Sequence, residues 1–384
     1  MSTAHSTHST QPSEPTNGWS VTGVALTILL GGLSVLALLV VWALSQPTGV
    51  RAELGAPATP TATHDMTTMP GAPAAKAAKP AVAAAGVAAG SKGTAPAHAP
   101  FDATLPPLAS GTVHHYTIRL ADEVLDIADG VQYQGWTFEG ASPGPVIHVR
   151  EGDWVDITLV NGGAIPHSID FHAALTAPNK SFKTIPSGGS VHFRFRASTP
   201  GAFMYHCGTP PVLAHIANGM YGAIIVDPKE GMPPVAKSFV LVSGEWYLAG
   251  DGKAKPATLD FEKAHQMRPD WVTFNGYANQ YKDHPLTADV GDTVRFYVVA
   301  AGPSLDTAFH VVGAMLDRVY LDSTTTNVLE GVQTQLVPAG GGMIFDVKFR
   351  EAGIYPFVSH SFAAADMGEL GLVNVGKVDG TMSH

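Results

Sequence analysis

The sequence predicts an all-β protein with two tandem β-sandwiches, at 106–229 and 235–378, preceded by one transmembrane helix and a flexible linker. Three observations carry this prediction. They are a long uncharged apolar segment near the start, short apolar or alternating runs separated by Gly, Pro and Asn, and the recurrence of such runs in two parts of the chain. Short runs with turn residues between them are typical of β-sandwiches. A composition of 41 Gly and 29 Pro in 384 residues fits short strands better than long helices.

The first part of the chain is expected to anchor the protein in a membrane. A short tail at 1–20 precedes the segment from Val21 to Leu44, which carries no charge. About 20 apolar residues suffice for a helix to cross a bilayer. No Lys or Arg precedes Arg51, whereas cleavable signal peptides usually begin with basic residues, so we expect an uncleaved anchor. Residues 45–105 are rich in Ala, Pro, Thr and Gly, which is typical of a flexible tether.

The two predicted sandwiches look like copies of each other. In the first, Gly152 opens a strand that leads to His172, and in the second, Gly291 opens a strand that leads to His310. Each copy then ends with a Gly, an aromatic-rich strand, a His and a closing strand. Recurrence in the same order indicates an internal duplication.

The net charge argues against a nucleic-acid-binding protein, and the cysteine content excludes an intrachain disulfide. The net charge is −10 and Lys and Arg form no dense cluster, so we expect no nucleic-acid partner, because such proteins need a basic surface. Cys207 is the single cysteine, which rules out an intrachain disulfide. A lone Cys is most often a buried and inert residue, so its neighbours decide whether it has a chemical role.

Those neighbours predict a copper site. Cys207, His215 and Met220 lie on one short segment, and His167 from a distant loop would complete a set of four ligands. Two His and one Cys in a trigonal array, with a distant axial Met, form the blue-copper arrangement. Sulfur ligands favour Cu(I) and imidazole suits Cu(II). A coordination geometry intermediate between those of the two oxidation states lets the copper gain and lose one electron with little rearrangement. We therefore predict a type 1 copper with these ligands rather than a cysteine in an ordinary core.

The same segment identifies a family resemblance. Cys-x7-His-x4-Met with His206 directly before Cys207, in a duplicated β-sandwich protein, resembles the copper-containing nitrite reductases. The resemblance covers about 106–378, and its most specific pieces are 167–172, His206-Cys207 and 355–360. It implies two cupredoxin-like Greek-key β-sandwiches, the first of which holds the type 1 copper.

The resemblance also implies a second, type 2 copper and a homotrimer. The ligands would be His172 and His206 of one subunit and His360 of its neighbour, which gives two coppers per subunit. His206 and Cys207 are adjacent, so one short covalent path would join the two metals. Three neutral imidazoles leave an open position, as a catalytic metal requires. Three His could also hold zinc, but the direct link to a redox copper favours copper.

The implied reaction is the one-electron reduction of nitrite to nitric oxide, which needs a proton donor beside the bound oxyanion. Asp170 matches the family's catalytic aspartate. The sequence departs from the family at Trp271, which stands where a second proton-relay histidine is expected, and His265 is the nearest upstream substitute. The implied electron donor is a small cupredoxin or a c-type cytochrome. Because of this copper chemistry, we expect a single-pass protein of the cell membrane with its copper domains on the periplasmic or extracellular side.

Two alternative functions remain compatible with the sequence. One is a membrane-tethered electron carrier or copper-binding protein with an impaired type 2 site, which the replacement at Trp271 favours. The other is a two-domain multicopper oxidase, which needs several His-x-His pairs and a His-Cys-His triplet. Gly208 follows Cys207 and neither predicted domain contains a His-x-His pair, so this alternative is the weaker one.

Overall fold

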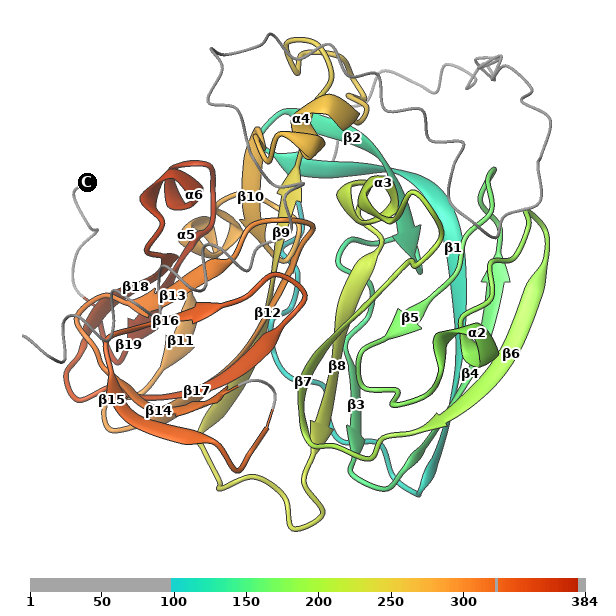
Figure 1. Cartoon of the computed structure of the whole chain (residues 1–384). Coiled ribbons are helices and arrows are strands. Elements are labelled where there is room, and N and C mark those ends of the chain that lie inside the picture. Colours follow the sequence, from blue (N-terminus) through green and yellow to red (C-terminus); the bar gives the residue numbers. More distant parts are fainter. Residues whose placement is uncertain (1–97, 322–323, 379–384) are drawn as a thin grey trace, which may run out of the picture. The chain divides into compact units, whose positions relative to one another are not determined.

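The computed structural model describes residues 98–321 and 324–378 (Figure 1). The predicted membrane anchor at 21–44 and most of the predicted tether lie outside these residues. Within the described ranges no helix is long and apolar enough to span a bilayer. The described residues are mostly strands, joined by turns and a few helices of four to six residues.

The first β-sandwich consists of two four-stranded sheets, in the orders β2-β1-β4-β6 and β3-β8-β7-β5. Alternation of apolar and polar residues explains how β6 packs: Phe193 and Phe195 are buried, whereas their neighbours His192 and Arg194 are exposed. The strands are β1 (Val113–Ala128), β2 (Val131–Phe138), β3 (Ile147–Arg150), β4 (Trp154–Asn161), β5 (Asp170–Phe171), β6 (Ser190–Arg196), β7 (Gly201–His206) and β8 (Tyr221–Asp227).

The second β-sandwich consists of a six-stranded sheet, β10-β9-β12-β17-β14-β15, and a five-stranded sheet, β11-β19-β18-β13-β16. Its core is rich in aromatic rings, among them Phe296, Phe309 and Phe357. The strands are β9 (Lys237–Trp246), β10 (Trp271–Phe274), β11 (Leu286–Ala288), β12 (Thr293–Gly302), β13 (Thr307–Val311), β14 (Leu316–Tyr320), β15 (Val328–Val332), β16 (Thr334–Val337), β17 (Gly342–Lys348), β18 (Gly353–Ser359) and β19 (Leu370–Val375).

Strand pairing repeats between the two sandwiches. Every pairing of the first recurs in the second: the parallel pairs β1/β4 and β3/β8 correspond to β9/β12 and β11/β19. The antiparallel pairs β1/β2, β4/β6, β5/β7 and β7/β8 correspond to β9/β10, β12/β17, β13/β18 and β18/β19. This repetition agrees with the duplication expected from the sequence, while the proposed domain limits stay predictions.

Short helices occupy equivalent loops of the two copies. Helix α3 (Val212–Ala217) joins β7 to β8, and α6 (Phe362–Asp366) joins β18 to β19 (Figure 1). The other helices are α2 (Pro178–Ser181), α4 (Phe261–His265) and α5 (Gln280–Asp283). The loops around α3 and α6 carry most of the predicted metal ligands.

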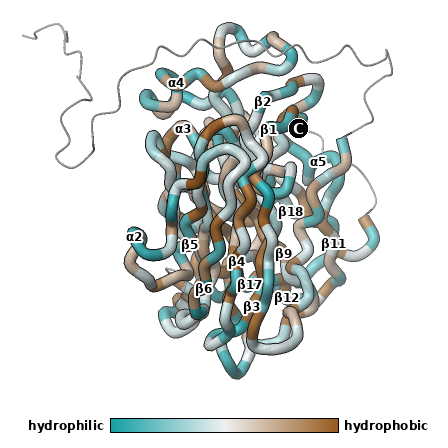
Figure 2. The backbone as a smooth tube through the Cα atoms, turned by 90° about the vertical axis from the view of Figure 1, so that its right-hand side faces the viewer, coloured by the Kyte–Doolittle hydropathy of each residue, from teal (hydrophilic) through white to brown (hydrophobic). Residues whose placement is uncertain are grey.

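The two sandwiches share an apolar contact. Strand β7 packs beside β12 and β17, and a buried cluster with residues from both copies includes Tyr221, Val240 and Ile344. Figure 2 shows hydrophobic residues along the strands and hydrophilic residues in many of the connecting turns. Burial of this apolar surface holds the end of β7, and thus His206 and Cys207, on a rigid support.

Candidate metal centres

The first cluster of candidate ligands is buried in the first sandwich. The Cys207 Sγ atom lies 3.2 Å from His215 Nδ1 and 3.9 Å from His167 Nδ1. The two Nδ1 atoms are 3.0 Å apart. His167, which precedes β5, is held by backbone hydrogen bonds in both directions with Ile185. The structure therefore brings together three of the four ligands that the sequence predicts for the type 1 copper.

The geometry of this triangle fits one metal ion. A point equidistant from the three atoms lies about 2.0 Å from each of them. Metal bonds to imidazole nitrogen are about 2.0–2.1 Å long, and bonds to thiolate are about 2.3 Å. An ion can therefore occupy the centre with only small adjustments of the side chains.

The surroundings keep both imidazoles in the form that binds metals. Burial lowers the pKa of His167 to about 4 and that of His215 to about 4, so both rings are neutral at pH 7. The backbone N–H of Ser168 donates a hydrogen bond to Cys207 Sγ over 3.3 Å. Hydrogen bonds to the sulfur are one means by which a protein tunes the potential of a copper–thiolate site. No sequence pattern indicated this contact of Ser168 with the sulfur.

Met220 lies next to this cluster through its backbone. The chain turns at Gly219, whose φ of 104° lies in the left-handed region that glycine adopts without strain. The N–H of Cys207 then donates to the Met220 carbonyl over 3.1 Å, and the N–H of Met220 donates to the His215 carbonyl over 3.2 Å. The Met220 side chain is fully buried in the same core as Cys207. Its role as the axial ligand stays a prediction.

Trp136 covers the cluster, and the sequence did not reveal it. The half-buried indole packs against His215 with ring centroids 4.9 Å apart, and against His167 with centroids 5.5 Å apart. His215 is consequently only 3% exposed. Trp136 is the aromatic group that lies against both candidate ligand imidazoles.

A second arrangement of imidazoles lies at the end of β7. The Nε2 atoms of His172 and His206 are 3.1 Å apart. His172 donates its Nδ1–H to the Gly340 carbonyl over 2.9 Å, and His206 donates its Nδ1–H to the Cys207 carbonyl over 3.0 Å. Because a carbonyl can only accept, each Nε2 keeps its lone pair for a metal. The two nitrogens subtend about 100° at an ion bound at about 2.0–2.1 Å, which suits tetrahedral coordination.

The alternation of side chains along a strand explains why neighbouring residues serve different centres. His206 ends β7 and is half-buried, whereas Cys207 follows it and is completely buried. Successive residues of a strand point to opposite faces. The chain thus passes directly from one candidate centre to the other.

Known proteins resemble the part of the chain that holds these residues. Residues 120–231 match the family model described as multicopper oxidase. The copper-containing nitrite reductase of Neisseria meningitidis serogroup B is 41% identical over 264 residues, which cover 67% of this chain and 67% of that protein. The chain belongs to the family of copper-containing nitrite reductases.

Further relatives of this family agree. The copper-containing nitrite reductase of Cereibacter sphaeroides is 32% identical over 281 residues, covering 67% of this chain and 75% of that protein. A copper nitrite reductase structure from Nitrosomonas europaea is 34% identical with a TM-score of 0.65, covering 69% of this chain and 94% of that chain. The cupredoxin-like sheets predicted from the sequence are confirmed, and the His/Cys/His donor set fits the copper of this family.

Asp170, the predicted proton donor of this nitrite reductase family member, lies beside the imidazole pair. It pairs directly with His206 across β5 and β7, so the two side chains leave the sheet on the same face. Desolvation and the neighbouring His206 lower the pKa of His172, whereas the Asp170 carboxylate acts in the opposite direction. This placement agrees with a role at the metal site, but the catalytic role itself stays a prediction.

His360 lies on the second sandwich, directly after β18, and is exposed. Its ring contacts His310 and Phe362. Within the described part of a single chain, no hydrogen bond or ring contact joins His360 to His172 or His206. One chain therefore shows two of the three predicted type 2 ligands together, and the third faces outward.

Trp271 and His265, the residues that the sequence analysis compared with a second relay histidine, contact other groups in the described part of the chain. Trp271 starts β10 and packs against a cluster that contains Trp246 and Tyr133. His265 ends α4, with its ring against Phe261. Among the described residues, no hydrogen bond or ring contact links His265 to the predicted ligands or to Asp170. The departure at Trp271 and a compensating role of His265 both stay predictions.

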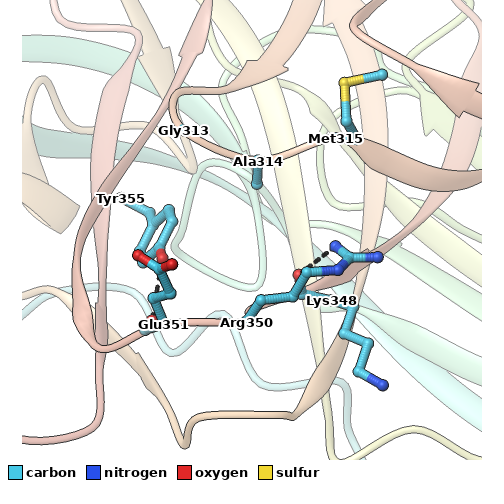
Figure 3. Close-up of a pocket in the computed structure, with 7 residues that line it drawn as sticks. All are labelled: Gly313, Ala314, Met315, Lys348, Arg350, Glu351 and Tyr355. Carbon is cyan, nitrogen blue, oxygen red and sulfur yellow. Dashed lines mark hydrogen bonds between the residues drawn. The ribbon is translucent and has the colours of Figure 1, made fainter.

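A surface hollow of about 540 Å³ lies on the second sandwich (Figure 3). Its Arg350 guanidinium binds Asp317 and the Lys348 carbonyl, so this charge is already paired. None of the predicted site residues lines the hollow, whose lining residues are Gly313, Ala314, Met315, Lys348, Arg350, Glu351 and Tyr355.

Proposed function

We propose that this protein reduces nitrite to nitric oxide, taking up one electron and two protons and releasing one water per nitrite. The observation that carries the proposal is the adjacency of His206 and Cys207. The Cys207 sulfur belongs to the triangle with His167 and His215, whereas the preceding residue, His206, directs its Nε2 toward His172. When bound, a type 1 copper would relay single electrons and a type 2 copper would bind the oxyanion.

Metal binding, the electron route and proton delivery would each be provided by residues of this chain. His167, Cys207, His215 and Met220 would hold the type 1 copper in a buried pocket that excludes water. The backbone between Cys207 and His206 provides the shortest covalent route between the two centres. The Asp170 carboxyl, on the same face as His206, would deliver a proton to the bound oxyanion.

The type 2 site would be completed by a neighbouring subunit. His172 and His206 supply two imidazoles at an exposed and a half-exposed position, and His360 is exposed on the second sandwich. A homotrimer in which His360 of one subunit approaches His172 and His206 of the next would complete three ligands and leave a fourth position open. The donor would be a small cupredoxin or a c-type cytochrome. The segment at 21–44 would tether the copper domains to the outer face of the cell membrane.

Metal analysis tests the proposed centres. We expect two coppers per chain, one with thiolate charge-transfer absorption and one without it. The His360→Ala variant should lose only the second copper, because the buried triangle does not include this residue. Retention of both coppers by this variant would contradict the proposed intersubunit site.

Nitrite turnover tests the proposed reaction against the electron-carrier alternative. Copper-loaded protein should form nitric oxide from nitrite with a chemical reductant, and Asp170→Asn should lower kcat by about 10²–10⁴-fold, the usual contribution of a proton donor. Thr176→Ala, a change of an exposed residue beyond the β5 loop, is the control. Equal and negligible turnover by wild type and Asp170→Asn, with an intact type 1 spectrum, would favour the carrier.

A further inference from the structure

The second sandwich contains a structural counterpart of Cys207. Ser359 lies six residues after the first residue of β18, as Cys207 does after the first residue of the corresponding strand β7. The Cys207 sulfur accepts a hydrogen bond from the Ser168 N–H over 3.3 Å. In the second sandwich, the Ser359 hydroxyl oxygen accepts one from the Ala308 N–H over 3.2 Å. Both side chains are completely buried, so a hydroxyl occupies the place of the thiolate.

Met220 has a counterpart in the same loop of the second sandwich, and this counterpart is Glu369. The Cys207 N–H donates to the Met220 carbonyl over 3.1 Å, and the Ser359 N–H donates to the Glu369 carbonyl over 3.3 Å. The residue before Met220 and the residue before Glu369 are both glycines, with φ of 104° and 115°. These values lie in the left-handed region that glycine adopts without strain. The turn that carries the predicted axial ligand is therefore present in both copies.

The places of the two imidazoles are taken by smaller side chains. The N–H of each of the two residues just compared donates to the carbonyl five residues earlier, which belongs to His215 at 3.2 Å and to Ala364 at 3.0 Å. Thr307 directly precedes the N–H that bonds to the hydroxyl, as His167 directly precedes the N–H that bonds to the sulfur. Four residues of the second sandwich thus stand at the places of the predicted copper ligands: Thr307 for His167, Ser359 for Cys207, Ala364 for His215 and Glu369 for Met220.

The Glu369 carboxyl connects these places. The side chain is 1% exposed, and the Thr307 hydroxyl donates to its Oε1 over 2.9 Å. The Ser359 hydroxyl also lies close enough to act on the carboxyl. Oε2 has no hydrogen-bond partner among the described residues. The carboxyl therefore reaches from the place of the axial ligand toward the places of one imidazole and the thiolate.

The surroundings favour the neutral form of this carboxyl. Burial raises the pKa of Glu369 from 4.5 to about 7. The negative charge of Glu245, which is also buried, acts in the same direction, whereas three hydroxyls act in the opposite direction. These hydroxyls belong to Ser243, Thr307 and Ser359. Neither a hydroxyl nor a neutral carboxyl supplies the soft sulfur ligand that Cu(I) prefers.

We propose that these four residues form a converted type 1 copper site, in which a protonated Glu369 carboxyl takes the place of the metal ion. This inference rests on the proposed type 1 site of the first sandwich, with which the four places were compared. The conversion gives the second sandwich a buried site that binds a proton instead of copper, so each chain holds a single thiolate-bound copper. The strands and the turn that hold the four places are common to both sandwiches. Restoring the ligand types should therefore restore copper binding.

The first experiment restores the ligands in the full-length protein. The variant carries Thr307→His, Ser359→Cys, Ala364→His and Glu369→Met together with Cys207→Ser, which removes the thiolate of the first sandwich. Cys207→Ser alone should show no thiolate absorption. After loading with copper, the restored variant should regain thiolate charge-transfer absorption with one thiolate-bound copper per chain, as metal analysis and electron spin resonance would show.

A matched control tests the structural register. It differs from the restored variant only in carrying Ser361→Cys instead of Ser359→Cys. Ser361 follows His360 as Cys207 follows His206, so the order of residues in the sequence would select it, but Ser361 is exposed. The control should bind no thiolate copper. A restored variant that unfolds cooperatively in urea but lacks thiolate absorption would overturn the inference, and so would equal absorption in both variants.

Infrared spectroscopy tests the proton on Glu369 without restoring any ligand. Below pH 7 the wild-type protein should show the C=O stretch of a protonated carboxyl that Glu369→Gln lacks, and the band should disappear above this pH. Absence of this band would overturn the inference even if the restored variant fails to fold.

The wild-type spectrum distinguishes failure of this inference from failure of the proposed function. If wild type shows thiolate absorption that Cys207→Ser abolishes, the type 1 site of the first sandwich stands, and a folded restored variant without such absorption refutes only the converted site. If wild type binds no thiolate copper, the proposed type 1 site is itself wrong, and the comparison between the two sandwiches falls with it.

Discussion

Glu369 is a buried carboxyl immediately before β19. Its replacement by Gln should stabilise the protein increasingly as the pH rises from 4.5 to about 7. The side chain is 1% exposed. The Thr307 hydroxyl donates to Oε1 over 2.9 Å, but Oε2 has no hydrogen-bond partner among the described residues. Burial raises the pKa of Glu369 from 4.5 to about 7, and neighbouring hydroxyls offset this only in part. A buried carboxylate without full hydrogen bonding is costly.

The sign of the effect follows from proton linkage. Between pH 4.5 and about 7 the folded protein keeps a proton on Glu369 that the unfolded chain has released, so stability falls as the pH rises through this window. One pKa unit corresponds to about 1.4 kcal/mol, so the ionised group destabilises the fold by up to about 3 kcal/mol above pH 7. Gln cannot ionise and so avoids this penalty.

Urea denaturation at a fixed protein concentration measures the difference. The free energy of unfolding of Glu369→Gln relative to wild type should be near zero at pH 4.5 and should rise by about 1–3 kcal/mol by pH 8. Glu230→Gln, a change of an exposed carboxyl in a turn, should show no such trend. A difference between Glu369→Gln and wild type that does not change with pH would refute the reasoning.

Three further predictions concern the first sandwich. Cys207→Ser should abolish thiolate absorption and leave the non-thiolate copper bound, as metal analysis with electron spin resonance would show; loss of both coppers would contradict two separate centres. Gly222→Ala would place a Cβ atom 2.3 Å from the buried Tyr205 ring, so it should lower the free energy of unfolding by about 1–3 kcal/mol. Gly208→Ala meets nothing closer than 3.6 Å and is the control; similar values for both variants would contradict the packing argument. Trp136→Ala should destabilise the protein by about 1–3 kcal/mol and shift the type 1 absorption. Trp136→Phe should keep most of the wild-type stability and a type 1 absorption close to that of wild type. An unchanged spectrum in Trp136→Ala would show that the indole does not constrain the ligand imidazoles.

The sequence was most informative where chemistry is local. Cys207, His215 and Met220 lie within one short segment, and their residue types alone indicate copper. The duplication was readable because Gly, His and aromatic residues recur in the same order in both copies. Alternating burial along strands such as β6 follows the side-chain period of two, so the all-β class was also predictable.

Tertiary structure decided what depends on residues far apart in the chain. Sequence alone did not indicate that Gly340 orients His172 from 168 residues away, that Trp136 covers His215, or that His310 contacts His360. These contacts arise from strand register and sheet packing, which many weak interactions determine together. Ligand identity is a property of single side chains and can be read along the chain, whereas ligand orientation depends on which backbone and rings the fold brings beside them.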